Sequence, residues 1–168
     1  NHLPLKIADR ASYSAQGITH LQRLENLKTI VVSGELLNDD ALIALGGFPA
    51  LSEFSAGEAC AGQRGWEGLA QSQSLEHLDI FSSHGLTASG IKAFSRLPQL
   101  SSLGVGSQRL DDEDLAPLAE FETLRRFSVG RGNVFTAAAF AHIARIPHLE
   151  QVSMSYVHTL GDDATKHL

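Results

Sequence analysis

The stretch Leu75–Leu100, LEHLDIFSSHGLTASGIKAFSRLPQL, contains two different hydrophobic periods in succession. In its first part, Leu78 and Ile80 alternate with polar residues, which is the two-residue period of a β-strand. In its second part, Ile91 and Phe94 follow one another at the spacing of residues on one face of a helix. The stretch therefore predicts a strand, a connection and a short helix.

The same pattern recurs along the chain at intervals of 24 or 25 residues. Each copy opens with leucine, carries apolar residues at its fourth and sixth positions, and then changes to the helical period. The segment HLPLKI, 25 residues before the unit that opens at residue 27, carries Leu5 and Ile7 at the same fourth and sixth positions. Repeats of this kind stack, and each unit buries its apolar face against its neighbours. We therefore expect one domain over residues 1–168, made of about seven units that start near residues 2, 27, 51, 75, 100, 124 and 149.

A short polar residue or glycine stands at each expected helix start, and such residues are preferred at N-caps. These residues are Asn38, Gly62, Thr87, Asp111, Thr136 and Gly161. We interpret the acidic run Asp111–Asp114 as helix capping, because acids oppose the positive end of the helix dipole. A calcium loop would need alternating ligands, a central glycine and a terminal glutamate, and this run lacks that order. Pro117 falls inside the expected helix of this unit, which should be short or kinked.

The units resemble leucine-rich repeats, and LTASGIKAFSRLPQL at Leu86–Leu100 is similar to the bacterial variety of that family. The resemblance implies an α/β fold: a right-handed solenoid, or horseshoe, with a parallel sheet on the concave face and short helices on the convex face. It also implies a scaffold that binds protein rather than an enzyme. Many family members carry an asparagine ladder after the strand, but this chain does not, at Glu35, Ala59, Ser83, Gln108, Gly132 and Val157. Buried backbone groups in those turns must find other partners.

Composition and charge narrow the function classes. The chain has 13 basic and 19 acidic residues and a net charge of −6, which argues against a nucleic-acid partner. It contains no apolar run of the roughly 18–20 residues that a membrane span requires. The single cysteine, Cys60, cannot form an internal disulfide, and no signal peptide is visible, so a cytoplasmic location is favoured. The chain starts at Asn1 and neither end resembles a cap, so we expect part of a longer chain, or end-to-end self-association through the terminal units.

The third, fifth and seventh residues of each unit, counted from its opening leucine, should face the concave side. This side is where a ligand would bind. Phe81 is the large apolar residue among them, flanked at its own position by Gly57 and Gly106. It is either a binding hot spot or a ring that covers the glycine backbone. The other candidate binding residues are Glu53, His77, Asp79 and Arg126, with Arg131 and Tyr156 one position further along.

Catalytic, cofactor and metal sites are not expected. The eight histidines form no HxxxH pair and no Cys/His cluster, and no nucleophile, base and orienting group can be assembled. An enzyme would need catalysis in a flanking region. The sequence therefore favours a non-catalytic module that binds a protein or peptide on its concave sheet. The alternative is a structural spacer in a larger multidomain protein.

Overall fold

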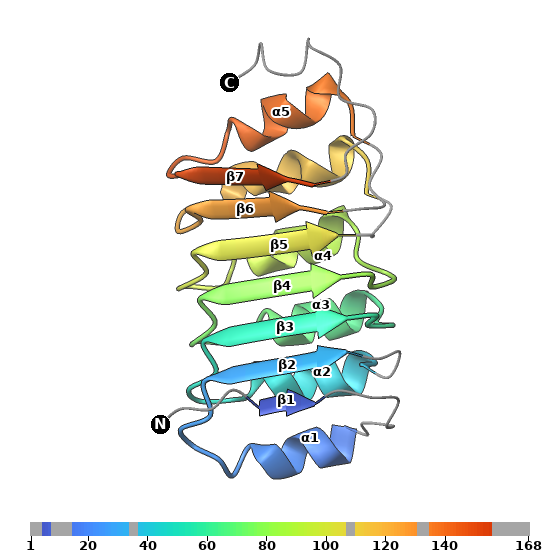
Figure 1. Cartoon of the computed structure of the whole chain (residues 1–168), viewed down its shortest axis with the longest axis vertical. Helices are drawn as coiled ribbons and strands as arrows, with labels where there is room; N and C mark the ends of the chain where they lie inside the picture. Colours follow the sequence, from blue (N-terminus) through green and yellow to red (C-terminus); the bar gives the residue numbers. More distant parts are fainter. Residues whose placement is uncertain (1–4, 8–14, 34–36, 107–109, 131–134, 156–168) are drawn as a thin grey trace.

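The computed structural model describes residues 5–7, 15–33, 37–106, 110–130 and 135–155. Strands and helices alternate along the chain (Figure 1). The elements are β1 (Leu5–Ile7), α1 (Ala15–Leu21), β2 (Thr29–Ser33), α2 (Asp39–Gly46), β3 (Glu53–Gly57), α3 (Gln63–Leu69), β4 (His77–Phe81), α4 (Ala88–Phe94), β5 (Ser102–Gly106), the 3₁₀ helix η1 (Glu113–Glu120), β6 (Arg126–Val129), α5 (Ala137–Ile143) and β7 (Gln151–Met154).

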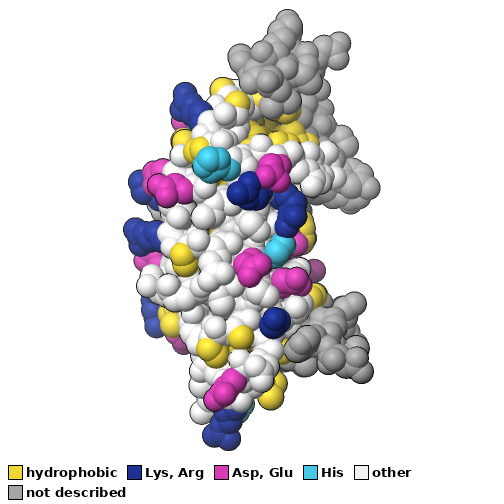
Figure 2. Space-filling view, turned by 90° about the vertical axis from the view of Figure 1, so that its left-hand side faces the viewer, with side chains coloured by type: hydrophobic (Ala, Val, Ile, Leu, Met, Phe, Trp, Pro, Cys, Tyr) yellow, Lys and Arg dark blue, Asp and Glu magenta, His cyan; other side chains and the backbone are white. Residues whose placement is uncertain are grey.

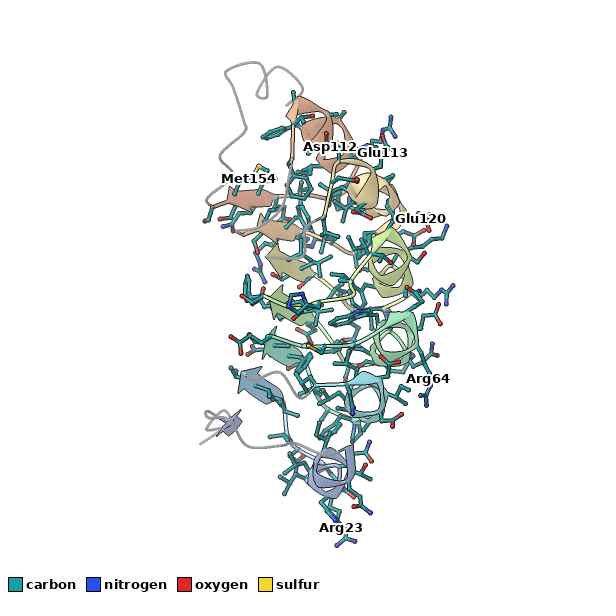
Figure 3. All side chains as sticks on the ribbon, turned by 90° about the vertical axis from the view of Figure 1, so that its right-hand side faces the viewer. Arg23, Arg64, Asp112, Glu113, Glu120 and Met154 are labelled. Carbon is teal, nitrogen blue, oxygen red and sulfur yellow. The ribbon has the colours of Figure 1, made fainter. Side chains whose placement is uncertain are left out.

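The strands form one parallel sheet of seven in the order β1 to β7, so each strand lies beside those of the preceding and following units. The register agrees with the repeat: Phe54 pairs with Leu78, which in turn pairs with Leu103. The first strand follows the same register, with Leu5 opposite Ile30. The helices lie along one face of the sheet (Figures 1 and 3). We call the opposite face the open face. The predicted α/β repeat architecture is thus confirmed.

The core fills the space between the sheet and the helices. Leu51, Leu75, Leu100 and Leu124, which open successive units, are all fully buried. The fourth and sixth positions of the repeat are also buried in β2 to β6, where they are Ile30, Val32, Phe54, Ala56, Leu78, Ile80, Leu103, Val105, Phe127 and Val129. Full burial of a large apolar side chain stabilises a fold by about 1.5–3 kcal/mol, so these repeated positions hold the stack together. In β7 the equivalent residues are only partly buried.

The predicted helix starts are largely where the sequence placed them. Asn38 and Thr136 each accept a hydrogen bond from a backbone N–H of the first turn, at 3.1 and 3.2 Å. Gly62 and Thr87 stand directly before α3 and α4 without a side-chain capping bond. Gly161 lies outside the described residues.

The run of four acids before and within η1 caps three neighbouring helices. Asp111 accepts from the backbone N–H of Asp114 at 3.2 Å, and Asp114 accepts from that of Asp111 at 3.0 Å. The second carboxylate oxygen of Asp114 accepts from Ala88 N at the start of α4, at 3.0 Å. Asp112 accepts from Thr136 N before α5, at 2.8 Å. Asp111 therefore binds a backbone N–H in the first turn of its own helix, as the capping interpretation predicts, but the N-cap position is Asp112, one residue later, which makes no side-chain capping bond in that helix. The same carboxylates also tie adjacent units to one another.

The element that contains Pro117 differs from the expected short or kinked α-helix. It is a 3₁₀ helix over all of Glu113–Glu120. Proline lacks an N–H and its ring clashes with the carbonyl four residues earlier in an α-helix. The three-residue period of the 3₁₀ helix still places Leu115 and Leu118 on one side, where both are buried.

The turn after β4 shows how buried backbone groups are satisfied without an asparagine. Ser83 is fully buried, and its hydroxyl accepts from Ala59 N and donates to Phe81 O, both at 3.1 Å. In the preceding turn, Cys60 N donates to Leu37 O at 3.0 Å. A serine hydroxyl and backbone hydrogen bonds between units therefore satisfy backbone groups of these turns.

Candidate functional site

The open face presents the third, fifth and seventh residues of each repeat unit, as predicted. The side chains that remain exposed or half-buried there are Thr29, Val31, Glu53, Ser55, His77, Asp79, Phe81, Ser102, Arg126, Ser128, Gln151, Ser153 and Ser155. Gly104 and Gly106 occupy the same positions but are buried, because neighbouring side chains lean over them. The face is therefore covered mainly by short polar side chains, with a few large or charged ones.

Phe81 lies at the end of β4 and extends across the next strands. A Cβ built on Gly106 would meet its ring carbon Cδ1 at 2.9 Å, and one built on Gly130 would meet it at 3.9 Å. The ring thus covers the glycine backbone of β5 and the residue after β6. Phe81 nevertheless stays 41% exposed. Both functions considered from the sequence therefore fit this residue: it covers glycines, and it offers an exposed aromatic surface.

His77 and Arg126 contact each other across the intervening strand β5, with Nε2 and Nη2 2.6 Å apart. A guanidinium group has only donors, so this contact is a hydrogen bond in the tautomer of His77 that carries its proton on Nδ1. That Nδ1 is buried and has no hydrogen-bond partner in the described structure. On the other side of His77, the Glu53 carboxylate accepts from the Thr29 hydroxyl at 3.2 Å.

Asp79 is half-buried in the middle of β4. A Cβ on Gly104 would overlap its Oδ1, so the carboxylate leans over this glycine of β5. Burial raises the pKa of the Asp79 carboxyl, and nearby His77 lowers it by a smaller amount. No residue of the described segments donates a hydrogen bond to this carboxylate. Among the described residues, the Asp79 carboxyl is thus partly desolvated and has no hydrogen-bond donor.

A cavity of about 320 Å³ opens on this part of the open face. It is lined by Thr29, Val31, Glu53, Phe54, Ser55, His77 and Asp79, which come from β2, β3 and β4. Figure 2 shows the side of the molecule where the strands begin, and charged side chains of both signs gather with a histidine along its right-hand part.

Several charged residues of the helix layer form ion pairs with a neighbouring unit. Arg64 lies 3.1 Å from Asp40, and Lys92 lies 2.8 Å from Glu120. Figure 3 shows Arg64 and Glu120 projecting from the helix layer, away from the strands. In the described segments, neither Glu53 nor Asp79 takes part in an ion pair.

The structure brings together most of the residues that the sequence singled out. Glu53, His77, Asp79 and Arg126 share one region of β3 to β6, and Phe81 lies two residues beyond Asp79. The predicted residues Arg131 and Tyr156 lie outside the described residues. Sequence reasoning did not include the cavity residues Thr29, Val31 and Ser55, although each occupies an outward position beside a predicted one.

Neither a metal site nor a membrane span is found in the part of the chain that the structure describes. There, no group of three or more His, Cys, Asp or Glu side chains could hold a metal ion. Nor does any helix of that part combine the length and apolar character needed to cross a bilayer. Comparison with protein-family models and with curated proteins finds no match to this chain.

Proposed function

We propose that this chain is a non-catalytic, leucine-rich-repeat module of right-handed solenoid form that binds a protein or peptide on the open face of its sheet. The regular strand–helix units and their buried leucines support the repeat assignment. The net charge of −6 favours a protein partner over a nucleic acid. Under this proposal the open face is the concave face of the solenoid.

The exposure of Phe81 is the observation on which the binding proposal rests. An aromatic side chain that is 41% exposed, on a face that also carries an exposed arginine, has the composition of an interface hot spot. Its neighbours at the same position of the sheet are Gly57 and Gly106, which carry no side chain beside the ring. Arg126, which is exposed and lies two strands away, adds a second anchor on the same face.

A structural spacer is the second candidate, and the hydrogen bonds and ion pairs between units are compatible with it. Asp112 and Asp114 bond to helix starts of neighbouring units, and Arg64 pairs with Asp40 of the preceding one. Such contacts stiffen a stack, and a stiff stack suits a spacer as well as a binding surface.

An affinity capture experiment separates the two candidates. The baits are the wild-type chain, the double variant Phe81→Ala/Arg126→Ala, and the control Arg64→Ala, whose side chain lies on the helix face. A binding module predicts proteins that the wild type and the control retain and the double variant loses. Equal recovery by all three baits, or no specific protein at all, would support the spacer.

Phe81→Ala alone separates the two roles of the ring. If Phe81 serves binding, the melting temperature of this variant stays close to that of the wild type while capture of the partner falls. A large drop in melting temperature would instead assign Phe81 to protection of the Gly106 backbone.

A further inference from the structure

The hydrogen bond between Arg126 and His77 is possible in one protonation state only. It joins β6 to β4 across the intervening strand, with Nη2 of Arg126 2.6 Å from Nε2 of His77. A guanidinium group has no acceptor atom, so this bond needs a free lone pair on Nε2. An imidazolium ring carries hydrogens on both nitrogens. Protonation of His77 therefore replaces the hydrogen bond with a contact between two cations.

His77 lies between this cation and two carboxylates. Glu53 is its partner in the sheet on β3, and Asp79 is two residues further along β4. These three residues line the same cavity of the open face. On the other side, the neighbouring residue of β5 is Ser102, which does not titrate, and Arg126 lies opposite that serine on β6. Among the described residues, Glu53, Asp79 and Arg126 are thus the charged groups that face the ring.

The two charge states of the ring suit different neighbours. The neutral ring accepts from Arg126, but its Nδ1 is buried and has no hydrogen-bond partner in the described structure. A buried donor without an acceptor raises the free energy of this state. The charged ring instead favours nearby anions. Burial raises the pKa of Asp79, and the Coulombic effect of a charged His77 ring lowers it by a smaller amount.

We propose that His77 is a pH-sensitive switch that holds Arg126 at neutral pH and releases it in mildly acidic solution. Histidine is the side chain whose charge ordinarily changes between about pH 5 and 8. When the ring gains its proton, the hydrogen bond across β5 is lost, and the new positive charge lies beside Glu53 and Asp79 instead. The bistable element is thus a pair of side chains on a sheet that itself does not move.

Release of Arg126 changes what the open face offers to a partner. A guanidinium group has five donors in a planar fork that matches a carboxylate. In the neutral state, His77 occupies Nη2 and takes one of these donors. Arg126 should therefore contribute more to partner capture at about pH 5.5 than at about pH 7.5. This consequence rests on the proposed function, in which Arg126 is an anchor for the partner.

A titration of the labelled whole chain from about pH 8 to about pH 5, followed by NMR, tests the switch without a partner. The Nε–Hε signal of Arg126 and the Cε1–Hε1 signal of the His77 ring should shift with one shared midpoint. In His77→Gln the side-chain amide oxygen still accepts from Arg126 but does not titrate, so the arginine signal should stay constant. The control His84→Gln removes an exposed histidine of the turn after β4, and Arg126 should titrate as in the wild type.

Affinity capture at the two pH values tests the effect on binding. In the wild-type background, the loss caused by Arg126→Ala should be at least about threefold larger at pH 5.5 than at pH 7.5, since one more hydrogen bond to a charged group is available. In the His77→Gln background, the same substitution should cost the same at both pH values. Each comparison is made within one background, so a general effect of pH on capture cancels.

Three results would overturn the inference: an Arg126 signal that does not follow the His77 ring, an Arg126 signal that titrates equally in His77→Gln, or an equal loss on Arg126→Ala at both pH values. If capture still depended on Phe81 in any of these cases, the proposed function would stand and only the switch would fall. Coupled titration of the two side chains without any Phe81-dependent partner would instead support the switch and overturn the proposed function.

Discussion

The substitution Asp79→Asn keeps the shape of the side chain and removes a charge that the fold partly desolvates. Burial raises the pKa of the Asp79 carboxyl above its ordinary value of 3.8, and His77 offsets only part of this effect. A carboxyl whose pKa is raised in the folded state contributes stability that is fully present below pH 3.8 and is lost as the pH rises through the folded-state pKa. At neutral pH the charged Asp79 therefore costs stability relative to a neutral asparagine.

The expected gain is small, because Asp79 is only half-buried and solvent screens its charge. We expect Asp79→Asn to raise the free energy of unfolding at pH 7 by about 0.5 kcal/mol. Urea unfolding midpoints measured at several pH values are the assay, since midpoints are more precise than extrapolated free energies. The difference between variant and wild type should shrink as the pH falls toward about 4.

Glu76→Gln is the matched control, because it removes an exposed carboxylate and should leave the midpoint unchanged at each pH. A lower midpoint for Asp79→Asn at pH 7 would refute the reasoning. So would a gain of the same size at all pH values, since it would have no connection with ionisation.

Three further substitutions test the stack itself, each by urea unfolding. Leu103→Ala, at a fully buried position, should cost about 2–5 kcal/mol, and a cost below about 1 kcal/mol would remove this position from the core. Gly85→Ala should cost at least about 2 kcal/mol, because Gly85 has φ 83° and a Cβ there would overlap the Ala61 carbonyl oxygen; an unchanged midpoint would contradict this close approach. Ser83→Ala should cost about 1–3 kcal/mol and speed hydrogen exchange at Ala59 N, and unaltered exchange would mean that the hydroxyl is not its acceptor.

Much of the fold could be predicted because every unit repeats the same pattern of apolar and polar residues. A leucine such as Leu75 opens each unit, and a shift of one residue in a strand would turn Leu78 and Ile80 out of the core. Register and burial therefore followed from the pattern alone. The 3₁₀ form of η1 was harder to predict, because Pro117 excludes a regular α-helix without specifying what replaces it.

Contacts between units were harder to predict than contacts within one. Asp114 was expected to act at its own helix, but it also accepts from Ala88 N of the preceding unit. Ser83 is not the asparagine of a ladder, yet its hydroxyl accepts the hydrogen bond of Ala59 N. Such bonds depend on the separation of stacked loops, which a pattern within one unit does not contain.

The candidate site was predicted in position but not in geometry. The alternation of the strands placed His77, Asp79 and Phe81 on one face, and that prediction is confirmed. The contact of His77 with Arg126 and the lean of Asp79 over Gly104 depend on side-chain directions across strands. Those directions decide which residues line the cavity, so the cavity became visible only in the structure.

Photo-crosslinking from position 81 tests the central claim most directly, namely that a protein partner docks on the open face of the sheet. A benzoylphenylalanine at Phe81 keeps an aromatic ring at this 41% exposed position, and the same group at Ile43, which is 37% exposed on α2, is the control on the helix face. In extracts of the cells that make the protein, our account predicts a discrete adduct from position 81 and none from position 43. Adducts from position 43 alone, equal adducts from both positions, or no adduct from position 81 would contradict it.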